Sequence, residues 1–200
     1  MKRLPITSKL GATNNFRMKT AEGYIADGDL KFESNDFLGA VKDYSSALEL
    51  DPKNADIFYN RGLAEFFQKN ISAAFKDLTS ALNLNPKHED ALFNRARIAA
   101  LLGSYENSIQ DYNKAIEING EDGELYTNRG AVKLQLKDHR GAIEDFSLAL
   151  NQNPADGKAL YNRGVAYLQI HDSANAMHDF TLAYQNGVVA AKEMLISLQN

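Results

Sequence analysis

Residues 123–156 read GELYTNRGAVKLQLKDHRGAIEDFSLALNQNPAD, and their pattern of small and large residues recurs every 34 residues. Small residues fill three positions of each copy: Gly28, Gly62, Ala96, Gly130 and Gly164; Ala40, Ala74, Ser108, Ala142 and Ala176; and Ala47, Ala81, Ala115, Ala149 and Ala183. Large apolar residues recur between them at Tyr44, Leu78, Tyr112, Phe146 and Phe180. A fixed period of this length predicts a repeat architecture, with copies at 21–54, 55–88, 89–122, 123–156 and 157–190.

Each copy is predicted to be two helices. The apolar residues Ile143, Phe146, Ala149 and Leu150 follow helical rather than alternating spacing. Turn-forming pairs lie midway through the copies, at Asn35-Asp36, Lys69-Asn70, Gly103-Ser104, Lys137-Asp138 and His171-Asp172. The recurrent small residues allow two helices to approach closely, because a small side chain leaves a recess for a large one.

This pattern resembles the tetratricopeptide repeat (TPR) family, whose terminal proline is matched at Pro52, Pro86 and Pro154. The resemblance implies an all-α fold: a right-handed α-solenoid of five tandem helix-turn-helix repeats. Some positions depart from the family pattern. Leu92 and Leu160 replace the usual early aromatic residue, and Gly120 and Val188 replace proline. Asn186-Gly187 indicates a helix stop, after which residues 189–200 are predicted to form a C-terminal capping helix.

The charge balance excludes some classes of protein. The first twenty residues hold five basic and no acidic residues, so the remaining 180 hold 17 basic and 26 acidic ones. An acidic body argues against duplex nucleic-acid binding. Residues 1–20 are predicted to be a flexible basic lead-in, with loose similarity to a mitochondrial transit peptide as the alternative. No secretory signal and no membrane-spanning apolar run is present, which favours a soluble, cytoplasmic protein.

A column of asparagines is the main candidate for ligand binding. In the family, the first helices of the repeats line a concave face, and here one first-helix position holds Asn60, Asn94, Asn128 and Asn162. The column resembles the asparagine ladder of the superhelix attached to O-linked N-acetylglucosamine transferases. An amide both donates and accepts hydrogen bonds, so such a row suits the backbone of an extended peptide. The alternative is that duplication alone preserved solvated asparagines.

Further residues are predicted to flank this ladder. Tyr59, Phe93, Thr127 and Tyr161 lie beside it, and Phe67 and Leu101 lie further along. Carboxylates recur at the starts of the first helices, at Glu22, Asp56, Asp90 and Glu124. They indicate either a preference for basic ligands or simple complementarity to the helix dipole.

A second ladder is predicted to be structural. Arg61, Arg95, Arg129 and Arg163 recur in the first helices, and Asp43, Asp77, Asp111, Asp145 and Asp179 recur in the second. Partly buried ion pairs that fix stacking register are favoured over a row of catalytic acids. Each arginine is predicted to pair with the aspartate of the preceding copy, because the first copy holds Asp27 instead of arginine. That scheme leaves Asp179 without a partner.

Other functional signals are missing. The places of the family's two-carboxylate clamp for heat-shock chaperone tails hold Ile25, Asp29, Asn60, Asp90 and Asn94, of which only Asn60 matches, so a chaperone-tail partner is disfavoured. No catalytic motif, metal site or cofactor site is indicated, and the histidines His88, His139, His171 and His178 are predicted at turns or exposed positions.

The sequence therefore predicts a non-enzymatic scaffold that binds an extended segment of a partner protein. A structural module that self-associates into homo-oligomers through its ends or convex face is the alternative. An auxiliary domain of a longer enzyme is disfavoured, because the expected cap ends the solenoid.

Overall fold

The computed structural model describes residues 19–199 of the chain, so all but the last two residues of the predicted lead-in lie outside it. The described residues form eleven α-helices and no strand, in agreement with the predicted all-α class. The helices are α1 (Ala21–Glu33), α2 (Phe37–Leu50), α3 (Ala55–Phe67), α4 (Ile71–Leu84), α5 (Glu89–Leu101), α6 (Tyr105–Ile118), α7 (Gly123–Gln135), α8 (His139–Gln152), α9 (Gly157–Gln169), α10 (Ser173–Gln185) and α11 (Ala190–Gln199).

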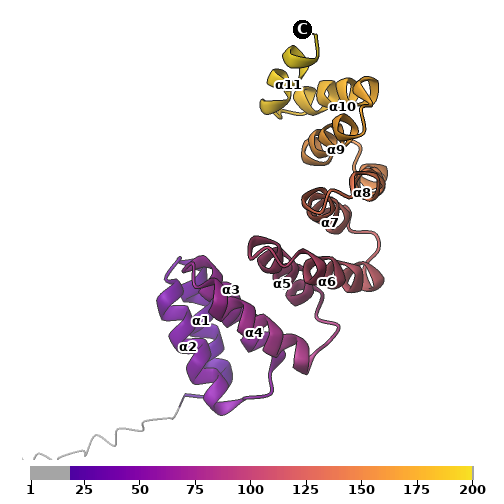
Figure 1. Ribbon diagram of the computed structural model, residues 1–200. Helices are drawn as coiled ribbons and strands as arrows, with labels where there is room; N and C mark the ends of the chain where they lie inside the picture. The colour runs from indigo at the N-terminus through magenta and orange to yellow at the C-terminus, as the bar shows by residue number, and fades with distance from the viewer. Residues whose placement is uncertain (1–18, 200) are drawn as a thin grey trace, which may run out of the picture.

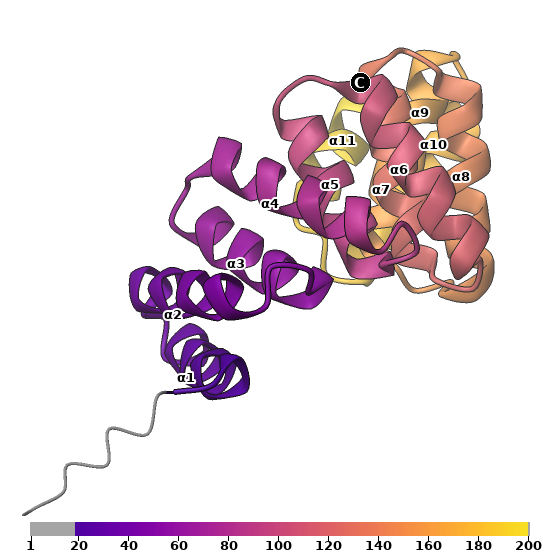
Figure 2. The same ribbon diagram turned by 90° about the horizontal axis from the view of Figure 1, so that it is seen from below.

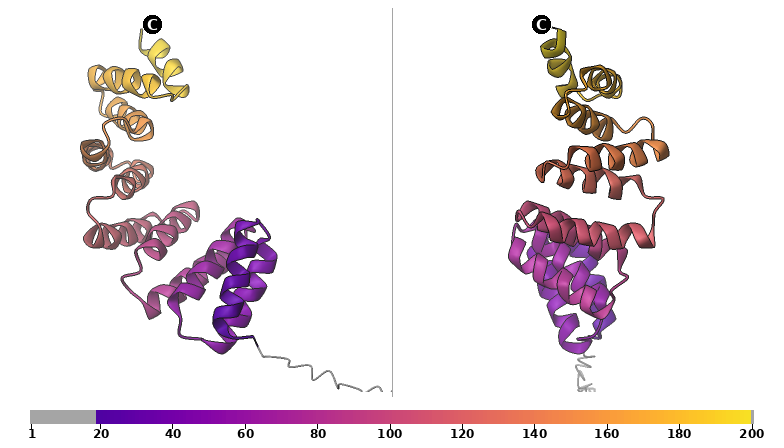
Figure 3. Two further views of the ribbon diagram at one scale, coloured as in Figure 1. Left: turned by 180° about the vertical axis from the view of Figure 1, so that it is seen from behind. Right: turned by 45° about the vertical axis from the view of Figure 1, so that its right-hand side comes forward.

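The first ten helices form five hairpins that stack in chain order into an α-solenoid (Figure 1). In Figure 1 the chain starts at the bottom with α1 and ends at the top with α11, and α5 and α7 lie to the left of α6 and α8. The first two hairpins are tilted relative to the following ones, as Figure 2 and the left panel of Figure 3 also show. The result is an elongated, curved array with its described ends far apart.

The turns inside the hairpins lie where the sequence predicted them. One residue of each turn has a left-handed backbone, with φ between 61° and 75°: Asn35, Lys69, Gly103, Lys137 and His171. Only the third of these is glycine, although L residues with side chains rarely adopt this conformation. The next residue is the N-cap of the following helix in all five hairpins, and Asp36, Asp138 and Asp172 accept a backbone N–H with their side chains.

Close packing inside each hairpin follows the small and large positions. Tyr44, Tyr112, Phe146 and Phe180 are each at most 1% exposed. A Cβ atom added to Gly130 would lie 2.9 Å from the Phe146 ring, whereas one added to Gly62 would lie 3.3 Å from the smaller Leu78. The missing side chain therefore provides the recess that an aromatic ring fills.

The last helix covers the end of the fifth hairpin. Helix α10 ends at Gln185, and Gly187 has a φ of 89°, so the predicted helix stop is confirmed. Met194, Leu195 and Leu198 of α11 pack against the buried cluster that contains Phe180. The apolar face of α10 is thus shielded in the way that terminal repeats of solenoids require.

Four arginines form ion pairs inside their own hairpins: Arg61–Asp77, Arg95–Asp111, Arg129–Asp145 and Arg163–Asp179. In each pair Nε and Nη2 donate to the two carboxylate oxygens over 2.6–2.9 Å. The predicted pairing with the preceding copy is wrong, and Asp179 is bonded rather than unpartnered. Both series step by 34, so spacing alone cannot separate the two schemes.

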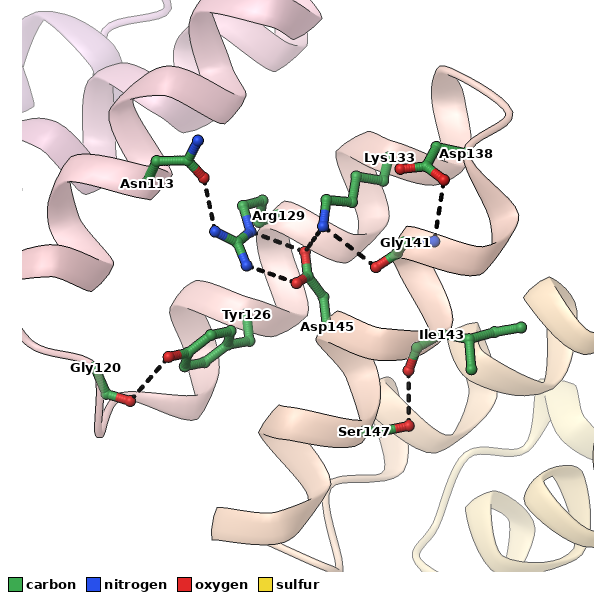
Figure 4. A network of polar contacts seen from close by, with 10 residues as sticks. All are labelled: Asn113, Gly120, Tyr126, Arg129, Lys133, Asp138, Gly141, Ile143, Asp145 and Ser147. Atoms are coloured by element: carbon green, nitrogen blue, oxygen red, sulfur yellow. Dashed lines mark hydrogen bonds and ion pairs between the residues drawn. The ribbon is translucent and has the colours of Figure 1, made fainter.

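The aspartate expected to pair with an arginine of the next copy, Asp43, instead pairs with Lys31 over 2.5 Å. Lys31 lies one helical turn after the position that holds arginine in the other copies. Lys133 occupies the equivalent place in the fourth hairpin and joins Arg129 on Asp145, with Nζ 2.9 Å from the carboxylate (Figure 4).

Each arginine also reaches the preceding hairpin. Its Nη1 donates to Ser45, Thr79, Asn113 or Ser147 over 2.6–3.4 Å; Figure 4 shows this contact for Arg129 and Asn113. One guanidinium therefore fixes its own hairpin and touches the one before, which a lysine could not do with the same planar geometry. Hydrogen bonding to the carboxylates raises the pKa of Arg61, Arg129 and Arg163.

The pairing scheme can be tested in the third hairpin. Arg95→Gln should lower the free energy of unfolding by about 3–5 kcal/mol, because it leaves buried Asp111 without its cation. Adding Asp111→Asn should recover most of that loss, whereas adding Asp77→Asn should recover none. Urea unfolding of the three variants measures this, and recovery by the second combination alone would restore the preceding-copy scheme.

The packing recess can be tested by two matched substitutions. Gly130→Ala should destabilise the protein by about 1–3 kcal/mol, because its methyl group meets the Phe146 ring. Gly62→Ala should be less destabilising than Gly130→Ala, since its nearest contacts, Asp77 Cβ and Leu78, lie 3.3 Å away and alanine favours a helix over glycine by about 1 kcal/mol. Equal melting temperatures for the two variants would show that the recess is not limiting.

Candidate functional site

The four asparagines of the predicted ladder lie on α3, α5, α7 and α9 and are all partly buried. Two of them bond to their own helix: Nδ2 of Asn94 donates to the Asp90 carbonyl, and Nδ2 of Asn128 donates to the Glu124 carbonyl, both over 2.9 Å. A primary amide has two N–H donors and two acceptor lone pairs. These bonds therefore use only part of the capacity of each amide.

Some of these amides also touch the neighbouring hairpin. Lys158 Nζ donates to Asn128 Oδ1 over 3.0 Å, and Asn94 Nδ2 lies 3.5 Å from the Tyr59 hydroxyl. The two middle asparagines thus connect successive first helices. Such contacts give the column a structural use beside any role in binding.

The predicted flanking aromatics differ in how much surface they present. Tyr59, Phe93 and Tyr161 are partly buried and pack against the core clusters. Phe93 contacts the Tyr112 ring at 6.1 Å between centroids, and Tyr161 contacts Phe180 at 5.5 Å. Part of the surface of each ring is therefore used in packing and is not available to a ligand.

Thr127, which shares this column, does not reach the surface. It is 1% exposed, and its hydroxyl donates to Asp156 over 3.3 Å. The expectation that it flanks the ladder is therefore wrong, because the small hydroxyl is enclosed at the junction of two hairpins.

Phe67 and Leu101 are the two exposed apolar candidates, at 51% and 68% exposure. Phe67 stacks on Phe37 at 5.0 Å between ring centroids and meets the edge of Phe32 at 5.5 Å. It belongs to an aromatic cluster at the turn ends of the first two hairpins. Leu101 has a different setting, at the rim of a hollow.

We call this second feature the central hollow. It has a volume of about 340 Å³ between α5, α6 and α7, and its lining is mainly apolar: Arg97, Ala100, Leu101, Tyr105, Tyr112, Asn128, Ala131, Val132 and Gln135. Two residues of the predicted site, Leu101 and Asn128, meet there. The guanidinium of Arg97 lies over the Phe93 ring at 5.5 Å and supplies one positive charge at the rim.

A smaller N-terminal hollow of about 210 Å³ lies between the first two hairpins. It is lined by Asp29, Phe32, Glu33, Tyr44, Asn60 and Leu63. Asn60 is the member of the predicted ladder that it contains. Asp29 and Glu33 were not predicted to bind a ligand, because no other copy holds an acid at either position.

The described residues contain neither a candidate metal site nor a candidate membrane-spanning helix. Among them, no group of three or more His, Asp or Glu side chains could hold a metal. No described helix is long and apolar enough to cross a membrane. His88 has a structural place, since its Nδ1 accepts the Ala91 N–H at the start of α5.

Models of tetratricopeptide repeats match residues 28–66 and 96–137, residues 127–187, and residues 55–88, which together take in 28–88 and 96–187. The chain belongs to the tetratricopeptide repeat family. Membership of this TPR family supports a protein-interaction scaffold. No curated protein sequence is significantly similar to the chain.

Several solved TPR structures share the fold. The MamA protein is 23% identical, with a TM-score of 0.79, over 87% of this chain and 95% of that one. MamA from Desulfovibrio magneticus RS-1 is 16% identical, with a TM-score of 0.80, over 83% and 94% of the two chains. YrrB, described as a TPR protein with an unusual peptide-binding site, is 22% identical, with a TM-score of 0.77, over 88% and 93%. At these identities the likeness concerns the fold alone.

Burial of three tyrosines predicts that this TPR array loses stability at alkaline pH. Burial raises the pKa of Tyr59 to about 12 and also raises the pKa of Tyr44 and Tyr112. Unfolded tyrosine titrates near pH ~10, so above that value the unfolded chain loses protons that the native state keeps. The melting temperature should therefore fall as the pH rises from about 10 to about 12. In Tyr112→Phe this fall should be smaller, and an unchanged pH profile would contradict the assignment.

Proposed function

We propose that this protein is a non-enzymatic scaffold that binds an extended segment of a partner along its first helices. The observation that carries the proposal is the central hollow, where an exposed Leu101, two aromatic walls and the amide of Asn128 meet between adjacent hairpins. Its mainly apolar lining with a few polar groups is typical of a recognition site. The peptide-binding site named for YrrB, which shares the fold, supports the same reading.

The parts of the site have separate tasks in this proposal. The hollow takes one apolar side chain of the bound segment. The remaining amide donors and acceptors of Asn60, Asn94, Asn128 and Asn162 hydrogen-bond to its backbone. Both sets of residues are held on packed helices, so the protein itself loses little conformational entropy on binding. The partner is then selected by its side chains and positioned by its backbone.

The amide ladder is tested with a peptide selected from a random library displayed on phage. Asn94→Ala combined with Asn128→Ala should weaken binding of that peptide about tenfold, as expected for the loss of two or more net hydrogen bonds. Fluorescence anisotropy with the labelled peptide measures the affinity. Thermal unfolding should change little, because alanine is a good helix former and both positions are only partly buried.

A matched control removes two exposed asparagines from second helices. Asn83→Ala combined with Asn151→Ala makes the same chemical change on α4 and α8 and should leave affinity unaltered. Equal affinity of all three proteins would exclude the ladder. If no peptide is selected and the molecular mass in solution rises with concentration, the self-associating module replaces the proposed function.

A further inference from the structure

The N-terminal hollow contains two acids that the repeat does not require. The column of Asp29 holds Leu63, Arg97, Ala131 and Val165 in the other copies. The column of Glu33 holds Phe67, Leu101, Gln135 and Gln169. Four hairpins therefore fold and stack without an acid at either position, and stacking does not explain the pair.

The two carboxylates are also close enough along α1 to repel each other. Asp29 and Glu33 are four residues apart on α1, a spacing at which like charges destabilise a helix. Within residues 19–199 neither carboxylate forms an ion pair, whereas every aspartate of the Asp43 column does. Among the described residues, the two acids that line the hollow therefore have no ion-pair partner.

One of these carboxylates is held in place by a buried ring. The Tyr44 hydroxyl, on a residue that is 1% exposed, donates to Asp29 Oδ1 over 2.7 Å. Within the part of the chain that the structure describes, this is the only hydrogen bond of that carboxylate. Its second oxygen remains an acceptor at a fixed position.

The other walls suit the stem and head of a long cationic side chain. Phe32 and Leu63 provide apolar contact for methylene groups, and the aromatic ring of Phe32 can attract a cation. Asn60 adds an amide oxygen that can accept from an ammonium or guanidinium group. The carboxylates lie on the same hollow, so charge and shape favour one class of occupant.

We propose that the N-terminal hollow is a socket for a lysine or arginine side chain of the bound partner segment. This socket rests on the proposed function, since the same segment continues along the asparagine ladder toward the central hollow. The scaffold then prefers segments that carry a basic residue at one place and an apolar residue at another.

Selection of random phage-displayed peptides on the whole chain tests the socket. Peptides selected on the natural sequence should share a lysine or arginine at a fixed distance from an apolar residue. Selection on Asp29→Asn combined with Glu33→Gln should give peptides that keep the apolar residue and lose the basic one. The socket would be excluded if the peptides selected on both proteins carried the same basic residue, or if neither set of peptides carried one.

Affinity measurements then locate the effect. For a selected peptide, replacing its basic residue by norleucine should weaken binding about tenfold to the natural sequence and less than about twofold to the double variant. The control variant Glu106→Gln combined with Glu144→Gln also removes two negative charges, at exposed positions of α6 and α8. It should keep the tenfold difference in affinity between the two peptides. Loss of the difference in this control would mean that net charge, not the socket, attracts the peptide.

The remaining outcomes separate the two proposals. If no peptide is selected on any version of the chain, the proposed function fails and the socket with it. If peptides bind through the ladder without a basic preference, the socket alone fails. If deleting residues 1–18 raises peptide affinity at least about tenfold, the chain's own basic segment fills the hollow and the partner side chain is excluded. Melting curves should show that Asp29→Asn with Glu33→Gln is folded, since an asparagine at position 29 can still accept from the Tyr44 hydroxyl.

Discussion

In the first, fourth and fifth hairpins, a glycine on the first helix allows the second helix to lie close enough for its aromatic ring to fill the gap. Gly28, Gly130 and Gly164 face Tyr44, Phe146 and Phe180 in this way, and the rings are almost fully buried as a result. A hairpin built like this still has apolar faces that it cannot cover alone. Stacking on the next hairpin covers them, so the close approach inside each unit leads to the extended array.

Stacking needs a register, and the arginines provide it. Each guanidinium holds a buried carboxylate of its own hairpin and donates one further hydrogen bond to the hairpin before it. The planar fork makes both contacts without bending. Register in turn decides which side chains of adjacent hairpins border the same space. The central hollow exists because Leu101 of α5 and Asn128 of α7 are brought to its two sides.

Recurrence in the sequence was enough to predict the fold. The small and large columns gave the hairpins and their turns, and Asn186-Gly187 gave the last stop, because these features depend on local conformation and on contacts within one unit. The ion-pair partners were mispredicted, since an arginine lies 16 residues from one aspartate and 18 from another, and both distances repeat. Thr127 was misplaced for a similar reason: its exposure depends on Asp156 of the following hairpin, which a single column does not reveal.

Residues that recur and residues that differ between copies also have different uses in recognising a ligand. A residue that recurs in most copies can serve a need that those copies share. Asn94 and Asn128 illustrate this, since each bonds to its own helix and Asn128 also bonds to Lys158 of the next hairpin. A general grip on a peptide backbone is a function of that kind, because a backbone also repeats. Selectivity requires positions that differ along the groove. Asp29 and Glu33 in the first hairpin and Arg97 in the third are such positions, and they border the two hollows. Within residues 19–199 these two carboxylates form no ion pair, and in the proposed socket a lysine or arginine of the partner supplies the counter-charge.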